Sequence, residues 1–337
     1  FTGSSAADTV TFGAAVASGT VNLGAGADSL TLAAGGNTLT VSGTESITGD
    51  AGADNITLAA AINGATINLQ GGSDQLTLAN GTNAITATQV ESITGGSGAD
   101  AVTLGAGTTL GTIDLGSGTD TLALSADGGT YTVTGVETTT GGVGADLVTL
   151  GSAGSGMTVT LGAGTDALTL ANGTNTVTAV DVESVTGGAG ADTLVLTNVA
   201  NTLTTAGVES IVGGTLTDTL ALTDITNALT VSSIESINGG TLDDSITLGT
   251  AVTGAVFDLK AGIDTLRLAS GDLLMAHVPS HHDHKLGEWI GIRAEVDHVV
   301  TFNRACPVTD RELCQMPCAK AEACEHTDPQ YQPVKFV

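Results

Sequence analysis

The chain has 337 residues, with 8 basic side chains against 35 acidic ones, and its formal net charge is −27. So acidic a protein repels nucleic acid and anionic membranes and attracts cations. No stretch is long and apolar enough to cross a membrane as a helix, so no membrane span is expected. Aromatic residues make up 2% of the chain and glycine accounts for 48 residues, which does not fit an ordinary mixed core.

An aspartate recurs through residues 1–272 at intervals of 20 or 26 residues. Each is followed by apolar residues two and four positions later, as Leu30 and Leu32 follow Asp28. Repetition on this scale is typical of a solenoid, because a unit this small cannot bury its apolar face without stacking on its neighbours. The recurring residues are Asp8, Asp28, Asp54, Asp74, Asp100, Asp120, Asp146, Asp166, Asp192, Asp218, Asp244 and Asp264.

The 26-residue intervals divide into three units of about nine residues. Asparagine marks the second unit, as at Asn37, and glutamate marks the third, as at Glu45. Alternation within each unit predicts a short strand with Leu, Ile and Val inward and Thr, Ser and Ala outward. We predict an all-β fold, a parallel β-solenoid (β-roll or β-helix) with 20- and 26-residue coils and a two- or three-sided cross-section. Stacking at ~4.8 Å per coil would place all twelve aspartates in one edge column about 50 Å long.

Glycine-rich turns precede several of these aspartates. Residues 95–100, 141–146 and 187–192 all read Gly-Gly-x-Gly-x-Asp. Glycine is needed where φ is positive or where backbone carbonyls crowd around a ligand. In these turns the chain resembles the RTX, or hemolysin-type calcium-binding, repeat family, whose nonapeptide is G-G-x-G-x-D-x-U-x with U apolar. The resemblance covers roughly residues 1–270, and it implies that stacked turns sandwich Ca²⁺ between glycine carbonyls and aspartate carboxylates.

The resemblance also implies a set of calcium ligands. The turns before Asp8, Asp218 and Asp244 depart from the motif, as where Leu216 replaces the third glycine, so these three and Asp264 are the weaker candidates. The main candidates are Asp28, Asp54, Asp74, Asp100, Asp120, Asp146, Asp166 and Asp192, with the glycines Gly95, Gly96, Gly98, Gly141, Gly142, Gly144, Gly187, Gly188 and Gly190.

Two interpretations of the aspartates stay open at this point. Aspartate can cap a turn by accepting backbone N–H groups, but asparagine, which this chain uses freely elsewhere, caps as well. Stacked carboxylates repel by roughly 1 kcal/mol per neighbour in water-like surroundings, which favours a bound cation. Oxygen ligands without His or Cys nearby indicate Ca²⁺. For the glutamates, a solvated face and metal ligation are both open.

The outward threonines that follow the aspartates also have two interpretations. Their regular spacing suits an ice-binding or adhesive surface, whereas the β-propensity of threonine on a solvent face explains it without any ligand. We favour the second. The residues concerned are Thr31, Thr57, Thr77, Thr103, Thr149 and Thr169.

Near Leu273 the repeat pattern ends. Residues 273–337 contain all six His and all four Cys of the chain. The segment His281–His284 suits a transition metal, although such clusters often bind metals incidentally. The four cysteines, Cys306, Cys314, Cys318 and Cys324, lack a C-x-x-C pair, which favours two disulfides over zinc in an exported protein. This segment is either a genuine C-terminal tail or the product of a frameshift or joined sequence, and we expect it to pack poorly on the solenoid.

Residues 1–272 contain neither His nor Cys, so no Ser/His/Asp or Cys/His arrangement can form there and we expect no enzyme. The expected function is a calcium-binding structural module of a secreted or cell-surface bacterial protein, such as a stalk, adhesin or surface-layer element, folding on Ca²⁺ binding after export. The alternative is an accessory module of an exported toxin, protease or lipase whose catalytic domain lies elsewhere. Expected partners are calcium ions and cell-surface polysaccharide or other protein surfaces.

Overall fold

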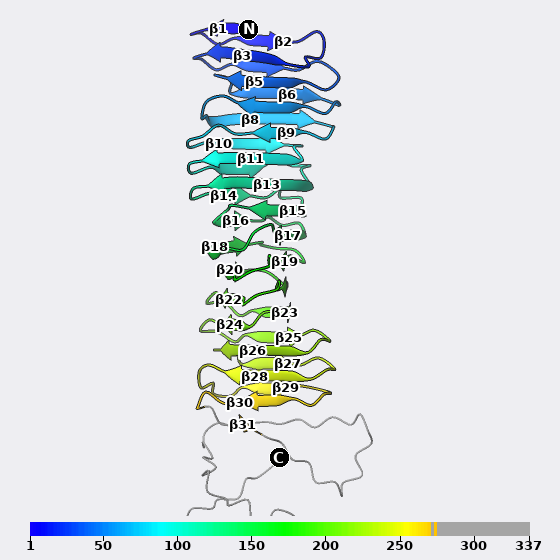
Figure 1. Cartoon of the computed structure of the whole chain (residues 1–337), viewed down its shortest axis with the longest axis vertical. Helices are drawn as coiled ribbons and strands as arrows, with labels where there is room; N and C mark the ends of the chain where they lie inside the picture. Colours follow the sequence, from blue (N-terminus) through cyan, green and yellow to red (C-terminus); the bar gives the residue numbers. More distant parts are fainter. Residues whose placement is uncertain (271–272, 275–337) are drawn as a thin grey trace, which may run out of the picture.

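The structure is a computed structural model that describes residues 1–270 and 273–274. Its strands alternate along the chain between two stacked parallel sheets, so each coil contributes one strand to each sheet (Figure 1). No helix occurs among the described residues, and hence none that could cross a membrane. The predicted all-β parallel solenoid is confirmed, and its cross-section has two sides.

The strands have the following bounds. The fifteen-stranded sheet contains β1 (Thr2–Ser4), β3 (Gly19–Gly24), β5 (Thr38–Ser42), β7 (Asn55–Leu58), β9 (Gln75–Thr77), β11 (Ser92–Ser97), β13 (Leu110–Ser117), β15 (Gly129–Thr134), β17 (Asp146–Leu150), β19 (Ala167–Thr169), β21 (Ser184–Thr186), β23 (Thr202–Ala206), β25 (Thr219–Leu222), β27 (Ser236–Asn238) and β29 (Val256–Asp258). The sixteen-stranded sheet contains β2 (Thr9–Thr11), β4 (Ser29–Thr31), β6 (Ser46–Asp50), β8 (Asn63–Gln70), β10 (Ala84–Thr88), β12 (Ala101–Leu104), β14 (Thr121–Ala123), β16 (Thr138–Thr140), β18 (Ser155–Thr160), β20 (Thr176–Val180), β22 (Thr193–Leu196), β24 (Ser210–Val212), β26 (Asn227–Ser232), β28 (Asp244–Leu248), β30 (Thr265–Arg267) and β31 (Leu273–Leu274).

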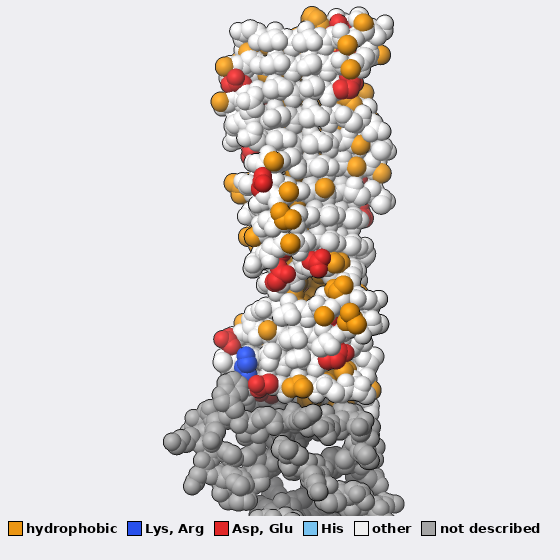
Figure 2. Space-filling model, turned by 180° about the vertical axis from the view of Figure 1, so that it is seen from behind, with side chains coloured by type: hydrophobic (Ala, Val, Ile, Leu, Met, Phe, Trp, Pro, Cys, Tyr) orange, Lys and Arg blue, Asp and Glu red, His pale blue; other side chains and the backbone are white. Residues whose placement is uncertain are grey.

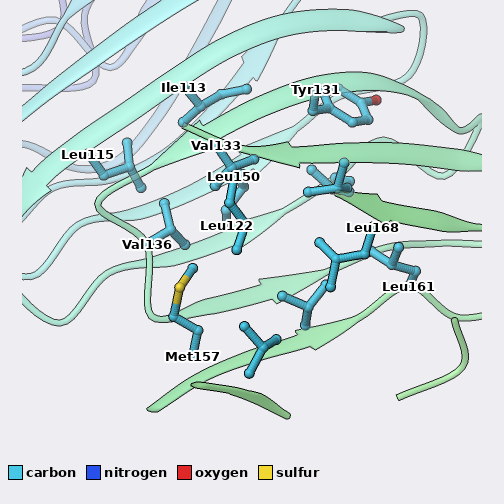
Figure 3. Packing of buried hydrophobic residues seen from close by; sticks show 14 of the residues in the cluster. Ile113, Leu115, Leu122, Tyr131, Val133, Val136, Leu150, Met157, Leu161 and Leu168 are labelled. Atoms are coloured by element: carbon cyan, nitrogen blue, oxygen red, sulfur yellow. The ribbon is translucent and has the colours of Figure 1, made fainter. Parts of the chain in front are cut away.

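One narrow aliphatic core runs between the two sheets. In β8, for example, Ala65, Ile67 and Leu69 are buried while the residues between them are not, as strand alternation requires. Figure 3 shows Val133, Leu150 and Leu122 close together in the interior, although they come from both sheets. The core therefore depends on stacking, because a single coil contributes too few side chains to enclose one another.

The register sets the coil length at 17 or 20 residues. Ser29 pairs with Thr9, twenty residues earlier, and with Ser46, seventeen residues later. The predicted 20-residue coil is present, but the 26-residue interval is not a coil. Seventeen residues lead from Asp28 to Glu45 on the next coil, and the nine that follow cross the solenoid to Asp54. A 26-residue interval is thus one and a half coils, because within it one of the marker residues (Asp, Asn or Glu) occurs in nearly every half coil.

This half-coil offset divides the aspartates between two edges. We name the turns before the even-numbered strands the even edge and the turns before the odd-numbered strands the odd edge. The predicted single column of twelve aspartates is wrong, since the chain changes edge at every 26-residue interval. Asp8, Asp28, Asp100, Asp120, Asp192, Asp244 and Asp264 lie at the even edge, and Asp54, Asp74, Asp146, Asp166 and Asp218 lie at the odd edge.

The same offset divides the threonines between the two faces. Thr31 and Thr103 belong to the sixteen-stranded sheet, whereas Thr57, Thr77, Thr149 and Thr169 belong to the other. At its C-terminal end the sixteen-stranded sheet finishes with β31, which pairs antiparallel with β30. The predictions for the histidines and cysteines, and for the packing of the tail beyond Leu274, lie outside the described residues.

Candidate metal site at the solenoid edges

The aspartates of the repeat lie inside the edges rather than on the surface. Asp8 and Asp264 are partly exposed, and only scattered acidic side chains show on the face seen in Figure 2. The other ten are at most 1% exposed: Asp28, Asp54, Asp74, Asp100, Asp120, Asp146, Asp166, Asp192, Asp218 and Asp244. Each stands just before a strand or at its first residue.

In most of these aspartates Oδ1 accepts a hydrogen bond from a backbone N–H on the preceding coil, and this bond links the two coils. The backbone N–H of Asn37 donates to Oδ1 of Asp54 at 2.9 Å, and the N–H of Asp54 donates to Oδ1 of Asp74 at 2.7 Å. The N–H of Asp74 then donates to Oε2 of Glu91 at 2.8 Å. We call this arrangement, in which each N–H donates to the side chain below it, an edge ladder. Asn83, Asp100, Asp120 and Glu137 form a second, equivalent ladder.

Asparagine begins a ladder because it supplies donors that a carboxylate lacks. Nδ2 of Asn37 donates to the carbonyls of Ala33 and Gly35 and to Oδ1 of Asp54, at 2.8–2.9 Å. Its Oδ1 accepts the N–H of Val16 at 3.0 Å. Every polar atom of this buried side chain is therefore hydrogen-bonded.

Glutamate ends a ladder. Its Oε2 accepts the backbone N–H of the aspartate on the preceding coil at 2.7–2.9 Å. The glutamates are partly exposed or exposed and are hydrogen-bonded to the backbone through Oε2, so a solvated face and metal ligation through Oε1 are both compatible with the structure. The six are Glu45, Glu91, Glu137, Glu183, Glu209 and Glu235.

The second carboxylate oxygen separates the aspartates into two groups. In four of them Oδ2 accepts the N–H of the residue four positions earlier, at 2.7–3.1 Å: Asp8, Asp192, Asp218 and Asp244. In seven others Oδ2 is buried and has no hydrogen-bond partner among the described residues: Asp28, Asp54, Asp74, Asp100, Asp120, Asp146 and Asp166.

These two groups largely follow the split predicted from the sequence. All seven aspartates with an unpartnered Oδ2 were main candidates for calcium, whereas three of the four capped ones were weaker candidates. Asp192 differs from the prediction. It has a full Gly-Gly-x-Gly-x-Asp turn, yet the N–H of Gly188 donates to its Oδ2 at 3.0 Å.

The glycines of the turn are needed for two different reasons. At Gly49 an ideal Cβ would lie 2.6 Å from the carbonyl oxygen of Leu69 on the next coil and 2.7 Å from Oδ2 of Asp54. No side chain fits there, so the carboxylate and the carbonyl approach the same bare backbone. Gly98 and Gly190 instead need glycine for conformation, because their φ angles are +141° and +140°.

Burial makes several of these carboxylates hard to ionise. It raises the pKa of Asp74 and of Asp146 to about 6, although backbone N–H groups near each carboxylate oppose the shift. Burial also raises the pKa of Asp120, Asp166 and Asp264. A proton or a cation on the carboxylate would each relieve this cost.

Asp146 is distinct from all the others. Both of its carboxylate oxygens are buried without a hydrogen-bond partner among the described residues, because Gly129 occupies the place of the ladder asparagine. Tyr131 fills the space beside Gly129, and its hydroxyl donates to the carbonyl of Thr108 at 2.7 Å. In the sequence Gly129 stands where the other repeats have asparagine, and the turn motif by itself gives Tyr131 no role. The available signal was a tyrosine at a place where the other repeats have an aliphatic residue, such as Leu39.

The carboxylate oxygens at one edge are too few to coordinate a hard cation alone, so backbone carbonyl oxygens must supply further ligands. Among the residues that the structure describes, no group of three or more His, Cys, Asp or Glu side chains is placed to hold a metal. Calcium takes six to eight oxygen ligands, including backbone carbonyls. An unpartnered Oδ2 and a carbonyl such as that of Leu69, which flank the same glycine, are ligands of this kind.

Comparison with protein-family models and with curated proteins found no match for this chain. The resemblance to RTX repeats therefore rests on the turn motif.

Proposed function

We propose that residues 1–272 are a calcium-binding structural rod, degenerate in its RTX-like repeats, within a secreted or cell-surface bacterial protein. The observation that supports this is the set of seven buried Oδ2 atoms without a partner. A buried carboxylate oxygen in that state carries a desolvation cost that a cation offsets. Turn capping alone does not require it, because Asn37 and Asn83 occupy equivalent ladder positions and accept backbone N–H groups from the coil above.

Calcium binding and folding are coupled in this proposal. The oxygens that flank Gly49 come from two adjacent coils, which lie together only in the stacked state. A cation held between them therefore adds its binding free energy to folding. A net charge of −27 opposes compaction of the cation-free chain. Folding would follow export, because cytosolic calcium is too low to fill such sites.

The role proposed for the folded rod is mechanical and adhesive, as a stalk, adhesin segment or surface-layer element. The continuous core makes the rod a spacer, and its two broad sheet faces carry polar side chains such as Thr57 and Thr103. Faces of this kind suit polysaccharide or protein surfaces as partners, without any catalytic group being involved.

The test is a calcium titration of the chelator-treated full chain, followed by circular dichroism. We expect β-type signal to appear in one cooperative step, with magnesium far less effective. Replacing Asp100, Asp120 and Asp146 together by Asn should raise the calcium concentration at the midpoint while keeping turn-capping ability. A matched variant that changes the exposed Asp114, Asp181 and Asp224 to Asn removes the same formal charge and should leave the midpoint nearly unchanged.

Two results would overturn the proposal. One is a chelated parent protein that is already fully folded. The other is a buried triple variant that folds at the same calcium concentration as the parent, which would show that the aspartates are turn caps only.

A further inference from the structure

Two aspartates with the same motif have different hydrogen bonds. Asp146 and Asp192 both follow a full Gly-Gly-x-Gly-x-Asp turn, and both are at most 1% exposed. Oδ1 of Asp192 accepts the amide of Asn175 at 2.7 Å, and its Oδ2 accepts the N–H of Gly188 at 3.0 Å. Both oxygens of Asp146 are unpartnered. The turn motif predicts the same role for both residues, whereas their carboxylate hydrogen bonds differ in the structure.

The unpartnered oxygens occur in stacked pairs. In five places one aspartate lies one 20-residue coil above another, and its N–H donates to Oδ1 of the lower residue at 2.7–2.8 Å. In three of these places Oδ2 of both members is buried and unpartnered. The three pairs are Asp54–Asp74, Asp100–Asp120 and Asp146–Asp166.

Other aspartates do not form such pairs. Asp28 lies below Asp8, but Oδ2 of Asp8 accepts both the N–H and the hydroxyl of Ser4, at 2.7 and 3.1 Å. Asp192 donates its N–H to Glu209 instead of to a second aspartate. On the preceding and following coils, the residues that occupy the same edge position are thus Asn175 and Glu209.

We infer that the rod has three cation sites, one at each stacked pair of unpartnered aspartates, and that Asp192 and the coils beyond it are held together without a cation. This inference rests on the proposed function and specifies where it operates. The sites alternate between the two edges, because Asp54–Asp74 and Asp146–Asp166 lie at the odd edge and Asp100–Asp120 lies at the even edge. The ligands are carboxylates and backbone carbonyls, so the cation is a hard divalent one such as Ca²⁺.

The coils beyond Asp192 show what replaces the cation. Gly214 and Gly240 donate their N–H groups to Oδ2 of Asp218 and Asp244 at 2.9 and 3.1 Å. Leucine stands where the motif has its third glycine, at Leu216 and Leu242. Hydrogen bonding therefore satisfies the second oxygen in these turns.

Aliphatic residues also stack at the edges of these coils. Val199 and Leu216 occupy equivalent places on adjacent coils of the odd edge, and Ile225 and Leu242 do so at the even edge. Glycines take both places in an earlier repeat, at Gly81 and Gly98. Apolar neighbours one coil apart favour stacking without any ligand.

The test compares Asp146→Asn with Asp192→Asn in the full chain, because both residues are buried and share the motif. Isothermal titration with calcium chloride alone measures the number of ions bound, and circular dichroism at saturating calcium verifies folding. We expect the parent to bind three ions, Asp146→Asn to bind two and Asp192→Asn to keep three. Asp166→Asn, in the same pair as Asp146, should also bind two and provides the test if Asp146→Asn does not fold.

The outcomes separate this inference from the proposed function. A parent chain that binds no calcium overturns both. A parent that binds calcium in a number other than three, or an Asp192→Asn variant that loses an ion, overturns the three-site assignment and leaves the calcium-binding rod standing.

Discussion

Gly129 lies directly beside Asp146 in the register of β15 and β17, and so it offers that carboxylate no side-chain amide donor. Tyr131 takes the space of the missing asparagine, because an ideal Cβ on Gly129 would lie 2.6 Å from its hydroxyl oxygen. Gly129 and Tyr131 are thus a coupled substitution within the repeat. In the five equivalent places Nδ2 of an asparagine donates to the aspartate 17 residues later at 2.7–2.8 Å: Asn37, Asn83, Asn175, Asn201 and Asn227.

This coupling predicts a non-additive pair of mutations. Gly129→Asn alone should lower the free energy of unfolding by roughly 1–3 kcal/mol, because its Cβ would lie 2.5 Å from the Thr109 carbonyl oxygen and 2.6 Å from the Tyr131 hydroxyl. Tyr131→Leu alone should cost about as much, through a lost hydrogen bond and a cavity. Together they restore the Asn–aliphatic combination of the other repeats, so the double variant should lose less than the sum. Urea unfolding measures this cycle, and strict additivity would show that the two residues are independent.

The ladder asparagines should contribute strongly to stability. Asn83 is fully buried, and its amide donates to Ala79, Gly81 and Asp100. Asn83→Ala should lower the free energy of unfolding by roughly 3 kcal/mol, because several buried polar groups lose their partner. The matched control is Asn80→Ala in the same turn, since Asn80 is exposed and should cost less than about 1 kcal/mol. Equal losses in thermal or urea unfolding would contradict the ladder role.

The glycine that flanks the carboxylate should not accept a methyl group. Gly49→Ala places Cβ 2.6 Å from the Leu69 carbonyl oxygen, so the coils must move apart, at a cost of roughly 1–3 kcal/mol. Gly13→Ala is the control, because nothing lies within 4 Å of its ideal Cβ and its φ is not positive. A Gly49→Ala variant with the unfolding midpoint of Gly13→Ala would show that the coils yield easily at this place.

The buried carboxylates predict that the chelated protein loses stability as pH rises. The pKa of Asp74 and of Asp146 is raised to about 6 from an ordinary value of 3.8, so the folded state binds more protons than the unfolded state between these values. The stability that these two protonated carboxyl groups contribute to the folded state is therefore fully present below about pH 4 and is lost as pH rises through about 6. Thermal unfolding in chelator at pH 4 and pH 7 measures the difference.

Two further measurements assign this pH dependence. Asp74→Asn with Asp146→Asn should reduce it, whereas the exposed Asp114→Asn should leave it as it is. Calcium should restore stability at pH 7 more than at pH 4, because it competes with the proton for the same oxygens. A chelated protein that becomes more stable between pH 4 and pH 7 would contradict the prediction.

Much of the architecture could be predicted from the alternation of residues. Leu30 and Ile56 are fully buried, as their places after Asp28 and Asp54 indicate. The difference in hydrogen bonding between the two groups of aspartates also follows the sequence, since glycine spacing in the turn distinguishes Asp100, whose Oδ2 is unpartnered, from Asp218, whose Oδ2 accepts an N–H. Asp192 was not predictable, because its motif is complete and only the N–H of Gly188 sets it apart.

The amino-acid pattern alone is enough to specify the solenoid, its inward aliphatic residues and the aspartates that recur in its turns. These follow from local periodicity, because any stacked arrangement must turn the same alternating residues inward. The coil length, the two edges and the stacked pairs instead depend on how the coils pair with one another. A 26-residue interval fits one three-stranded coil or one and a half two-stranded coils equally well. The choice depends on which backbone groups pair between coils, as Ser29 pairs with Ser46, and that register is a property of the stacked chain.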